Sequence, residues 1–256
     1  MSNAKIEDQS FEKFASLNKI HDAVALVMGQ NPVGIERTKD FLKKFNELDI
    51  SCQTLFIDWA NTPKVKIPIN ENRCNVEEIA RHEMAHIVVA KSLGFRTGEA
   101  TLVIYSADRS HLGTSEIFLD SPITSLNEIT TYLKRRAMVL LSGYLSEDNN
   151  SIDRSRCAAN IYEYYKSESD IQKAVELIQI LFNLEGVTNF IDRKKRQDAI
   201  AQHALTIVDN NFEVIDVLAK RFAERIEFYE QRIGWQTHEI DEQPEILQIK
   251  KYTDLN

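Results

Sequence analysis

Most of the chain carries apolar residues at the three- and four-residue spacing of amphipathic helices, and only short stretches have the pattern of strands. Before residue 70 this spacing predicts helices over about residues 11–29 and 35–48, and residues 52–57 read as a short strand. Pro63 and Pro68 mark a loop after it. We interpret residues 1–70 as an N-terminal extension or small α/β subdomain whose sequence indicates no chemistry.

Downstream, the pattern predicts a helix over residues 75–93 and two strands, 100–105 and 114–119, that form a hairpin. Ser125 and Glu128 form a capping box that opens a helix to about Leu145, and residues 149–156 are polar enough to be a loop. Further helices are expected over residues 157–165, 168–183, 193–208 and 212–233. Residues 236–256 show little periodicity, so we expect this tail to be extended or partly disordered. The expected fold class is mainly α (α+β), with a small β element beside the helix of residues 75–93.

The helix of residues 75–93 is bounded by residues that favour helix ends. Asn75 suits an N-cap, and Glu78 follows three residues later, which is close to a capping box. Gly94 suits the left-handed position that ends a helix. The four residues after His86 are apolar on nearly all sides of the helix, so we expect this helix to be buried in the core.

This helix contains the motif His82-Glu83-Met84-Ala85-His86, an H-E-x-x-H sequence. On a helix, His82 and His86 project from the same face, so their imidazoles can bind one Zn²⁺. Glu83 is then placed to act as a general base toward a water that zinc activates. A catalytic zinc takes three protein ligands and keeps one position open for water, so the motif leaves one ligand to be found.

In one extended form of the motif, a glycine and then a third histidine follow H-E-x-x-H. Here Val89 stands at the glycine position and Ser92 at the histidine position, so the third ligand is not that histidine. Four other histidines are scattered, and nothing in the sequence pairs one with the motif: His21, His111, His203 and His238. A carboxylate on a predicted helix or at its end is the better candidate, and four qualify: Glu147, Asp148, Glu168 and Asp170.

Asp170 lies at the edge of an apolar stripe on its predicted helix, a stripe formed by Ile171, Ala174, Val175, Ile178 and Phe182. A carboxylate at that edge points toward the core, where it needs a partner or a metal. The alternative is that Asp170 completes a Ser167-x-x-Asp cap in the first helical turn, where the helix dipole also favours it. From spacing alone, the capping role is the stronger interpretation.

The length and composition fit a globular protein of one large domain or two small ones, and the net charge bears on which classes of partner it can bind. The chain has 256 residues, a net charge of −8 and a pI near 5.4, which argues against a nucleic-acid-binding surface. Its 3 cysteines are widely spaced and odd in number, so no disulfide framework is expected and a reducing, cytoplasmic setting is the default. The N-terminus has no apolar signal core and no apolar run could span a bilayer, so we expect a soluble protein without a membrane partner.

The segment of residues 81–94, RHEMAHIVVAKSLG, resembles the FtsH family of zinc peptidases, whose motif typically reads AHExGHAVVA followed by LG. Leu112-Gly113 before the second strand resembles the family's next LG, and residues 141–147, LSGYLSE, resemble its LGGRAAE. Residues 169–174, SDIQKA, are similar to its NDLxxAT, in which the aspartate is the third zinc ligand. The likeness covers about residues 75–235 in the family's order, although the helices after residue 199 resemble the family only in pattern.

This resemblance implies that His82, His86 and Asp170 bind one Zn²⁺ per chain and that Glu83 is the catalytic base. It also implies a helical, zincin-like peptidase domain over residues 71–235, which lies between the N-terminal segment of residues 1–70 and the tail of residues 236–256.

The chain departs from the family at several points. Arg81 replaces a small residue, Ala85 stands where glycine is usual, and residues 144–146 replace Arg-Ala-Ala, so the local packing must differ. No G-x-x-x-x-G-K-[ST] motif occurs, and the first 70 residues are too few for an ATPase module, so we expect a stand-alone relative of the peptidase domain. The family's rings depend partly on that module, so an oligomer is allowed but not predicted from the sequence.

We therefore expect an ATP-independent zinc metalloendopeptidase, a hydrolase that acts on peptides or unstructured protein segments. The strand beginning at Thr101 is expected to bind an extended peptide by edge pairing. Three tyrosines are unplaced candidates for the donor that stabilises the oxyanion: Tyr105, Tyr144 and Tyr162.

Three alternatives stay open. The protein could be a catalytically silent peptidase fold that acts as a binding or regulatory module, although the presence of Glu83 argues against this. The metal could be a structural zinc closed by Cys74 or Cys157, but Cys74 is not on the face of His82 and His86. Finally, the two histidines could be ordinary helix residues.

Overall fold

The computed structural model describes residues 46, 47, 50, 51, 53, 54, 68, 69, 73–105, 110–119, 122–147, 150–164 and 168–252. The chain divides into two compact units, Met1–Val65 and Lys66–Asn256, and the labelled elements belong to the second. In the first unit, Ile50, Ser51, Gln53 and Thr54 are helical, so the strand predicted over residues 52–57 is wrong at Gln53 and Thr54. The Thr54 hydroxyl donates to the Ile50 carbonyl at 2.8 Å, a bond typical of a helical turn. The helix predicted over residues 11–29, and that of residues 35–48 apart from Asn46 and Glu47, lie outside the described residues.

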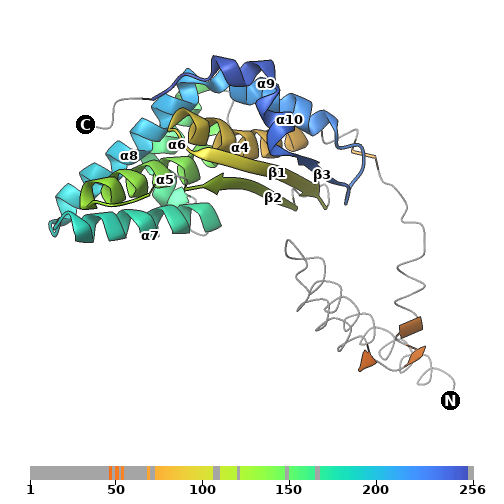
Figure 1. Cartoon of the computed structure of the whole chain (residues 1–256), viewed down its shortest axis with the longest axis horizontal. Helices are drawn as coiled ribbons and strands as arrows, with labels where there is room; N and C mark the ends of the chain where they lie inside the picture. Colours follow the sequence, from red (N-terminus) through yellow and green to blue (C-terminus); the bar gives the residue numbers. More distant parts are fainter. Residues whose placement is uncertain are drawn as a thin grey trace. The chain divides into compact units, whose positions relative to one another are not determined.

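The histidine-bearing helix, α4 (Arg73–Ser92), forms the centre of the second unit and packs against α5, α9 and strands β1 and β2 (Figure 1). Burial on all sides is confirmed, because six residues from Met84 to Ala90 other than His86 are fully buried. The C-terminal prediction is also confirmed: Gly94 has φ 86°, and the next N–H, of Phe95, donates to the Ala90 carbonyl at 2.9 Å. The predicted N-cap is wrong, since the helix already includes Arg73 and Asn75 lies in its first turn.

The small sheet has the strand order β2-β1-β3 and is antiparallel throughout. Strands β1 (Arg96–Ile104) and β2 (His111–Phe118) confirm the predicted hairpin and pair from Arg96–Phe118 to Ile104–His111. Strand β3 (Arg232–Trp235) pairs with the other side of β1, from Ala100 to Val103. The central strand therefore has no free edge there, and the prediction that a peptide pairs with the strand from Thr101 is wrong.

Helices α5 to α7 follow strand β2 in the chain (Figure 1). The predicted capping box is confirmed for α5 (Leu126–Ser146), since Ser125 accepts from the Glu128 N–H and the Glu128 carboxylate accepts from the Ser125 N–H. Helix α6 (Ser151–Tyr164) begins inside the stretch predicted as a loop, so that prediction is wrong. The polar residues of this stretch suggested a loop, but Arg154 is buried by residues of other helices. Its guanidinium lies 2.7 Å from Asp209 Oδ1 and 4.0 Å from the centroid of the Phe212 ring.

Helices α7 (Ser169–Leu184) and α8 (Phe190–Asn210) lie close to their predicted spans. Helix α9 (Phe212–Glu224) is shorter than predicted, and Ile233 belongs to β3 instead. The chain turns after α9 because the Gln231 side chain accepts from the Glu227 N–H at 2.7 Å. The Glu230 N–H then donates to the Ile104 carbonyl at 2.6 Å, which leads the chain into the sheet.

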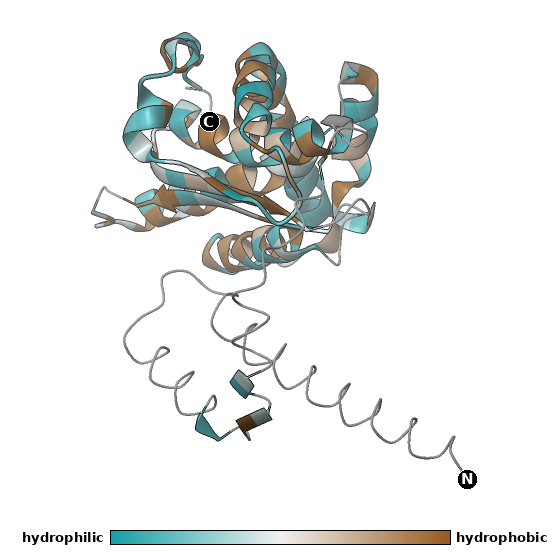
Figure 2. Cartoon of the chain, turned by 90° about the vertical axis from the view of Figure 1, so that its right-hand side faces the viewer, coloured by the Kyte–Doolittle hydropathy of each residue, from teal (hydrophilic) through white to brown (hydrophobic). Residues whose placement is uncertain are grey.

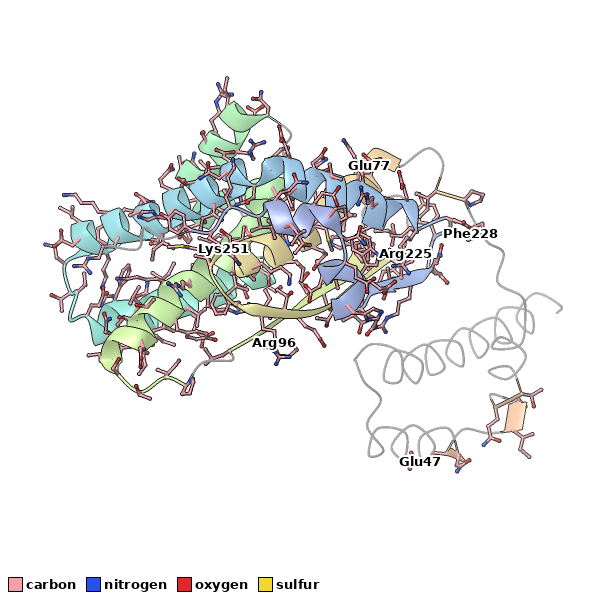
Figure 3. All side chains as sticks on the ribbon, turned by 45° about the horizontal axis from the view of Figure 1, so that its top comes forward. Glu47, Glu77, Arg96, Arg225, Phe228 and Lys251 are labelled. Carbon is pink, nitrogen blue, oxygen red and sulfur yellow. The ribbon has the colours of Figure 1, made fainter. Side chains whose placement is uncertain are left out.

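The C-terminal segment is folded, so the prediction of an extended or partly disordered tail is wrong for its described part. It forms α10 (Thr237–Asp241) and the 3-10 helix η2 (Pro244–Gln248). Ile240 is fully buried, and the Lys251 ammonium, labelled in Figure 3, donates to the Lys91 carbonyl at 2.7 Å. The segment thereby covers the end of α4.

The architecture confirms the expected class: mainly helical, with a small three-stranded antiparallel sheet. The helices carry both hydrophobic and hydrophilic residues along their length, as amphipathic helices around a core do (Figure 2). Among the described residues, no helix combines the length and apolarity that a membrane crossing needs.

Candidate metal centre

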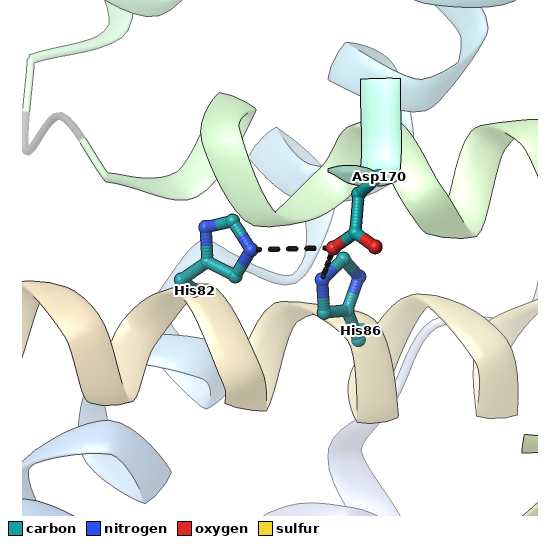
Figure 4. A group of neighbouring side chains, drawn as sticks. All are labelled: His82, His86 and Asp170. Carbon is teal, nitrogen blue, oxygen red and sulfur yellow. Dashed lines mark hydrogen bonds and ion pairs between the residues drawn. The ribbon is translucent and has the colours of Figure 1, made fainter. Parts of the chain in front are cut away.

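Three predicted ligands meet at one point between α4 and α7 (Figure 4). His82 and His86 project from the same face of α4, and Asp170 reaches them from the first turn of α7. The Asp170 Oδ2 atom lies 3.1 Å from His86 Nε2 and 3.6 Å from His82 Nε2. The ligand atoms of the three residues all lie within 4.8 Å of one another. Two ligands at about 2.0–2.1 Å on a tetrahedral ion are separated by about 3.3 Å, so these spacings suit one ion.

The Nδ1 atom of each imidazole is already hydrogen-bonded, so the Nε2 atoms are the ones that face Asp170 and the place where an ion would bind. His86 Nδ1 lies 2.7 Å from the Val139 carbonyl, and because a carbonyl only accepts, Nδ1 carries the proton. In the neutral ring Nε2 is then an acceptor that faces the Asp170 carboxylate, which is also an acceptor. Two facing acceptors at 3.1 Å need a cation or a proton between them. The donor set therefore fits a metal ion.

His82 is held by a carboxylate in the same way. Its Nδ1 atom lies 2.9 Å from Glu147 Oε1, the carboxylate–histidine arrangement that orients metal ligands. Glu147, one of the four candidate ligands, thus lies behind His82 instead of completing the group around the ion.

The electrostatics of the group favour a positive charge. Burial lowers the pKa of His82, but the hydrogen bonds that its ring donates to Asp170 and Glu147, together with the negative charge of Glu83, outweigh burial and raise the pKa to about 10. Burial raises the pKa of Asp170, but its hydrogen bonds to the two histidines prevail and hold that pKa well below the usual range. Three carboxylates around two imidazoles make a site that stabilises a cation.

Gly143 allows α5 to approach the His82 ring. A Cβ atom at this position would lie 2.5 Å from His82 Cε1 and 2.6 Å from Cδ2, closer than real side chains pack. The Tyr144 ring also packs edge-on against the His82 ring, with a centroid separation of 4.6 Å. Gly143 is also one of the residues shared with the FtsH segment LGGRAAE, and its close approach to the His82 ring is a physical reason for glycine here.

Glu83 is buried next to the sheet and does not join the ligand group. The Ser115 hydroxyl lies 2.7 Å from Glu83 Oε2 and 3.0 Å from its backbone carbonyl, so β2 fixes the side chain. A Cβ at Gly113 would lie 2.6 Å from Glu83 Cδ, so glycine is needed where β2 crosses this carboxylate. A cavity of about 200 Å³ opens beside it and is lined by Glu83, His86 and Asp170 among others.

Arg81, a departure from the FtsH pattern, is buried and braces the site. Its guanidinium donates to Asp216 Oδ1 at 3.0 and 3.1 Å and to the Glu147 carbonyl at 2.9 Å. It therefore ties α4 to α9 and fixes the residue whose carboxylate holds His82. At this position, where the FtsH motif has a small residue, the chain has a buried arginine that links α4, α9 and Glu147.

The other candidate ligands have different roles or lie outside the described residues. Glu168 accepts a hydrogen bond from the Tyr144 hydroxyl at 3.1 Å, and Asp148 is outside the described residues. Glu168 is the N-cap of α7 and makes no side-chain cap bond, and Asp170 lies in the first turn of this helix, as predicted. Ser167, the other residue of the predicted cap, lies outside the described residues. The Asp170 carboxylate faces the histidines.

The remaining histidines and the described cysteine lie elsewhere. His111 begins β2, His238 lies in α10, and His203 pairs with the Tyr252 hydroxyl, while His21 is outside the described residues. The Cys157 thiol lies 4.0 Å from the Tyr144 carbonyl, and the group that could hold a metal contains no cysteine among the described residues.

The three tyrosines considered as oxyanion donors differ in position. Tyr105 is exposed at the end of β1, and the Tyr162 hydroxyl donates to the Gln197 carbonyl at 3.1 Å. Only Tyr144 contacts the site, through the His82 ring, and its hydroxyl is bonded to Glu168.

Sequence reasoning missed two residues at this site. Ser115 and Arg136 belong to segments far from the motif in sequence, and nothing local marks either as functional.

The chain matches no protein-family model and no curated protein. The likeness to FtsH peptidases therefore rests on the quoted motifs, and the function drawn from it is a proposal.

Proposed function

We propose that this protein is an ATP-independent zinc endopeptidase that hydrolyses peptides or unstructured protein segments. The strongest support is the position of Glu83, whose buried carboxylate lines the same cavity as His86 and Asp170. A structural metal site is closed by its ligands and needs neither a base nor an open space beside it.

Zinc is the ion we propose for His82, His86 and Asp170, because two imidazoles and a carboxylate form a known type of catalytic zinc site. When bound, zinc lowers the pKa of a coordinated water toward about 7 and polarises the carbonyl under attack. Iron(II) also accepts two histidines and one carboxylate. A general base beside the ligands favours hydrolysis, and hence zinc.

Glu83 is the general base of this proposal. It takes the proton from the attacking water and delivers it to the leaving amine, a positioned transfer worth about 10²–10⁴ in rate. The hydrogen bond from Ser115 restricts rotation of the Glu83 carboxylate, so the base is oriented before substrate arrives.

The substrate is proposed to bind along β2. This is an edge strand of the described sheet, and Gly113, Thr114 and Ser115 from it line the cavity. Only an extended segment can pair with a sheet edge, which favours unstructured substrates over folded ones.

The test is to measure bound metal and the cleavage of an unfolded protein before and after chelation, and again after zinc is restored. We expect one zinc per chain and cleavage that is lost and regained with it. Asp170→Ala should lose most zinc, whereas Asp192→Ala, an exposed aspartate in the first turn of α8, should behave as wild type. Unchanged metal content in Asp170→Ala would refute the ligand set. Zinc binding without cleavage of unfolded substrates would instead favour the second candidate, a catalytically silent binding or regulatory module.

A further inference from the structure

Arg136 of α5 has a buried polar group without a partner. Among the described residues, three buried side-chain atoms lack a hydrogen bond: Thr97 Oγ1, Arg135 Nε and Arg136 Nη1. Of these residues, only Arg136 lines the cavity that also contains Glu83, His86 and Asp170. The unpaired donor therefore belongs to a residue that lines the cavity of the candidate centre.

The other cation of this cavity is already engaged. Lys173 of α7 lies with Nζ 3.3 Å from Asp170 Oδ1, and most of its side chain is exposed. The cavity anions are engaged as well, Glu83 by Ser115 and Asp170 by the two histidines. Arg136 is thus the charged group of the described lining with an unused donor.

An unpaired guanidinium N–H that is buried away from water destabilises the folded protein, because the hydrogen bond it made to water is lost and not replaced. Burial lowers the pKa of Arg136, which reflects the same cost, and the guanidinium nonetheless remains charged. The ligand that best recovers this cost is planar, anionic and has two oxygens, since the guanidinium fork matches a carboxylate.

We propose that Arg136 forms a carboxylate-binding subsite beside the metal centre, and that it selects peptides that place a carboxylate in this cavity. The selectivity for substrates rests on the proposed peptidase function, whereas carboxylate binding does not. About 200 Å³ is room for one side chain or one terminal residue, not for a larger group. Ile117, Val139 and Leu140 also line the cavity and add apolar surface to it.

Two parts of a peptide supply a carboxylate: its C-terminus and an acidic side chain. The probes are therefore one fluorescent hexapeptide made in four forms, with a single Glu or Gln and with a free or amidated C-terminus. Binding is measured by anisotropy to full-length Glu83→Gln protein loaded with zinc, so that the peptide is not cleaved.

We expect the matching carboxylate form to bind about 10-fold or more tightly than its neutral counterpart, as a hydrogen bond to a charged group predicts. Adding Arg136→Met should abolish this preference, and Arg136→Lys should retain part of it because the charge remains without the fork. Arg135→Met is the matched control: it removes a neighbouring arginine that lines a different cavity, and the preference should persist. Zinc also attracts carboxylates, but equally in all these variants.

A difference in affinity between the Glu and Gln peptides identifies the side chain as the source of the bound carboxylate. A difference between the free and amidated peptides identifies the C-terminus. No preference in any pair, or equal losses in Arg135→Met and Arg136→Met, would overturn the subsite. Zinc content and circular dichroism establish that each variant is folded, and Arg136→Gln replaces Arg136→Met if that variant is not.

Cleavage by the zinc-loaded protein with Glu83 intact separates the two proposals. Cleavage with equal kcat/KM on acidic and neutral forms leaves the peptidase intact and removes the subsite. Carboxylate preference without cleavage retains the subsite and removes the peptidase.

Discussion

Gly143→Ala changes one hydrogen into a methyl group, and its expected effect is loss of zinc with little loss of fold. The added Cβ would lie 2.5 Å from His82 Cε1, whereas ordinary contact begins near 3.4 Å, so the ring must retreat by about 0.9 Å, the difference of the two. Metal–ligand distances tolerate only about ±0.2 Å. The retreat also disturbs the 2.9 Å contact with Glu147.

The cost to folding is small by comparison. Alanine is better than glycine inside a helix by about 1 kcal/mol, and overpacking costs about 1–3 kcal/mol, so the net destabilisation is about 0–2 kcal/mol. Loss of a group that merely orients a ligand lowers metal affinity about 10–100-fold. Displacing the ligand itself should cost at least 100-fold.

The assay is competition for zinc with a chromophoric chelator, together with urea unfolding of the zinc-free proteins. Gly98→Ala is the matched control, because its Cβ would meet the Glu116 and Phe118 side chains at 2.8 and 2.7 Å, neither of which is a ligand. It should keep wild-type zinc affinity. A folded Gly143→Ala protein with wild-type affinity would refute the placement of the His82 ring.

Other substitutions separate the ligands from the base. Gly113→Ala should keep zinc but slow cleavage at least 10-fold, since the methyl displaces the Glu83 carboxylate, and unchanged kcat would contradict this. Glu147→Gln should weaken zinc binding about 10–100-fold by removing the carboxylate behind His82, as measured by chelator competition, and wild-type affinity would argue against that role. Zinc affinity should also rise about tenfold per pH unit from pH 7 to 9. Below its raised pKa of about 10, His82 holds a proton that must leave before zinc binds, so a plateau above pH 7.5, as for an ordinary imidazole, would contradict the raised pKa.

Features that depend on neighbouring residues could be predicted from the sequence. The buried character of α4, its glycine end at Gly94 and the capping box at Ser125 are all set within one or two turns, and the structure confirms them. The same holds for the β1–β2 hairpin, whose strands are close in sequence.

Features that depend on residues far away in the sequence could not be predicted from it. Strand β3 is 4 residues long and forms only because β1, over 100 residues earlier, offers an edge. The start of α6 looks like a polar loop until Asp209 and Phe212 bury Arg154.

At the site, the motif gave His82, Glu83 and His86 from local spacing alone. Asp170 is different: spacing favoured a capping role, and only the packing of α7 against α5 brings its carboxylate to the histidines. Ser115 carries no local signal, since its contact with Glu83 depends on where β2 crosses α4.

The proposed function depends above all on Glu83 acting as the base of a zinc-dependent hydrolysis. The most direct measurement compares wild type with Glu83→Gln on the same unfolded protein, with zinc determined in each sample. We expect one zinc per chain in both proteins, and cleavage at least about 10²-fold slower in Glu83→Gln. Equal cleavage rates at equal zinc content would contradict this role of Glu83.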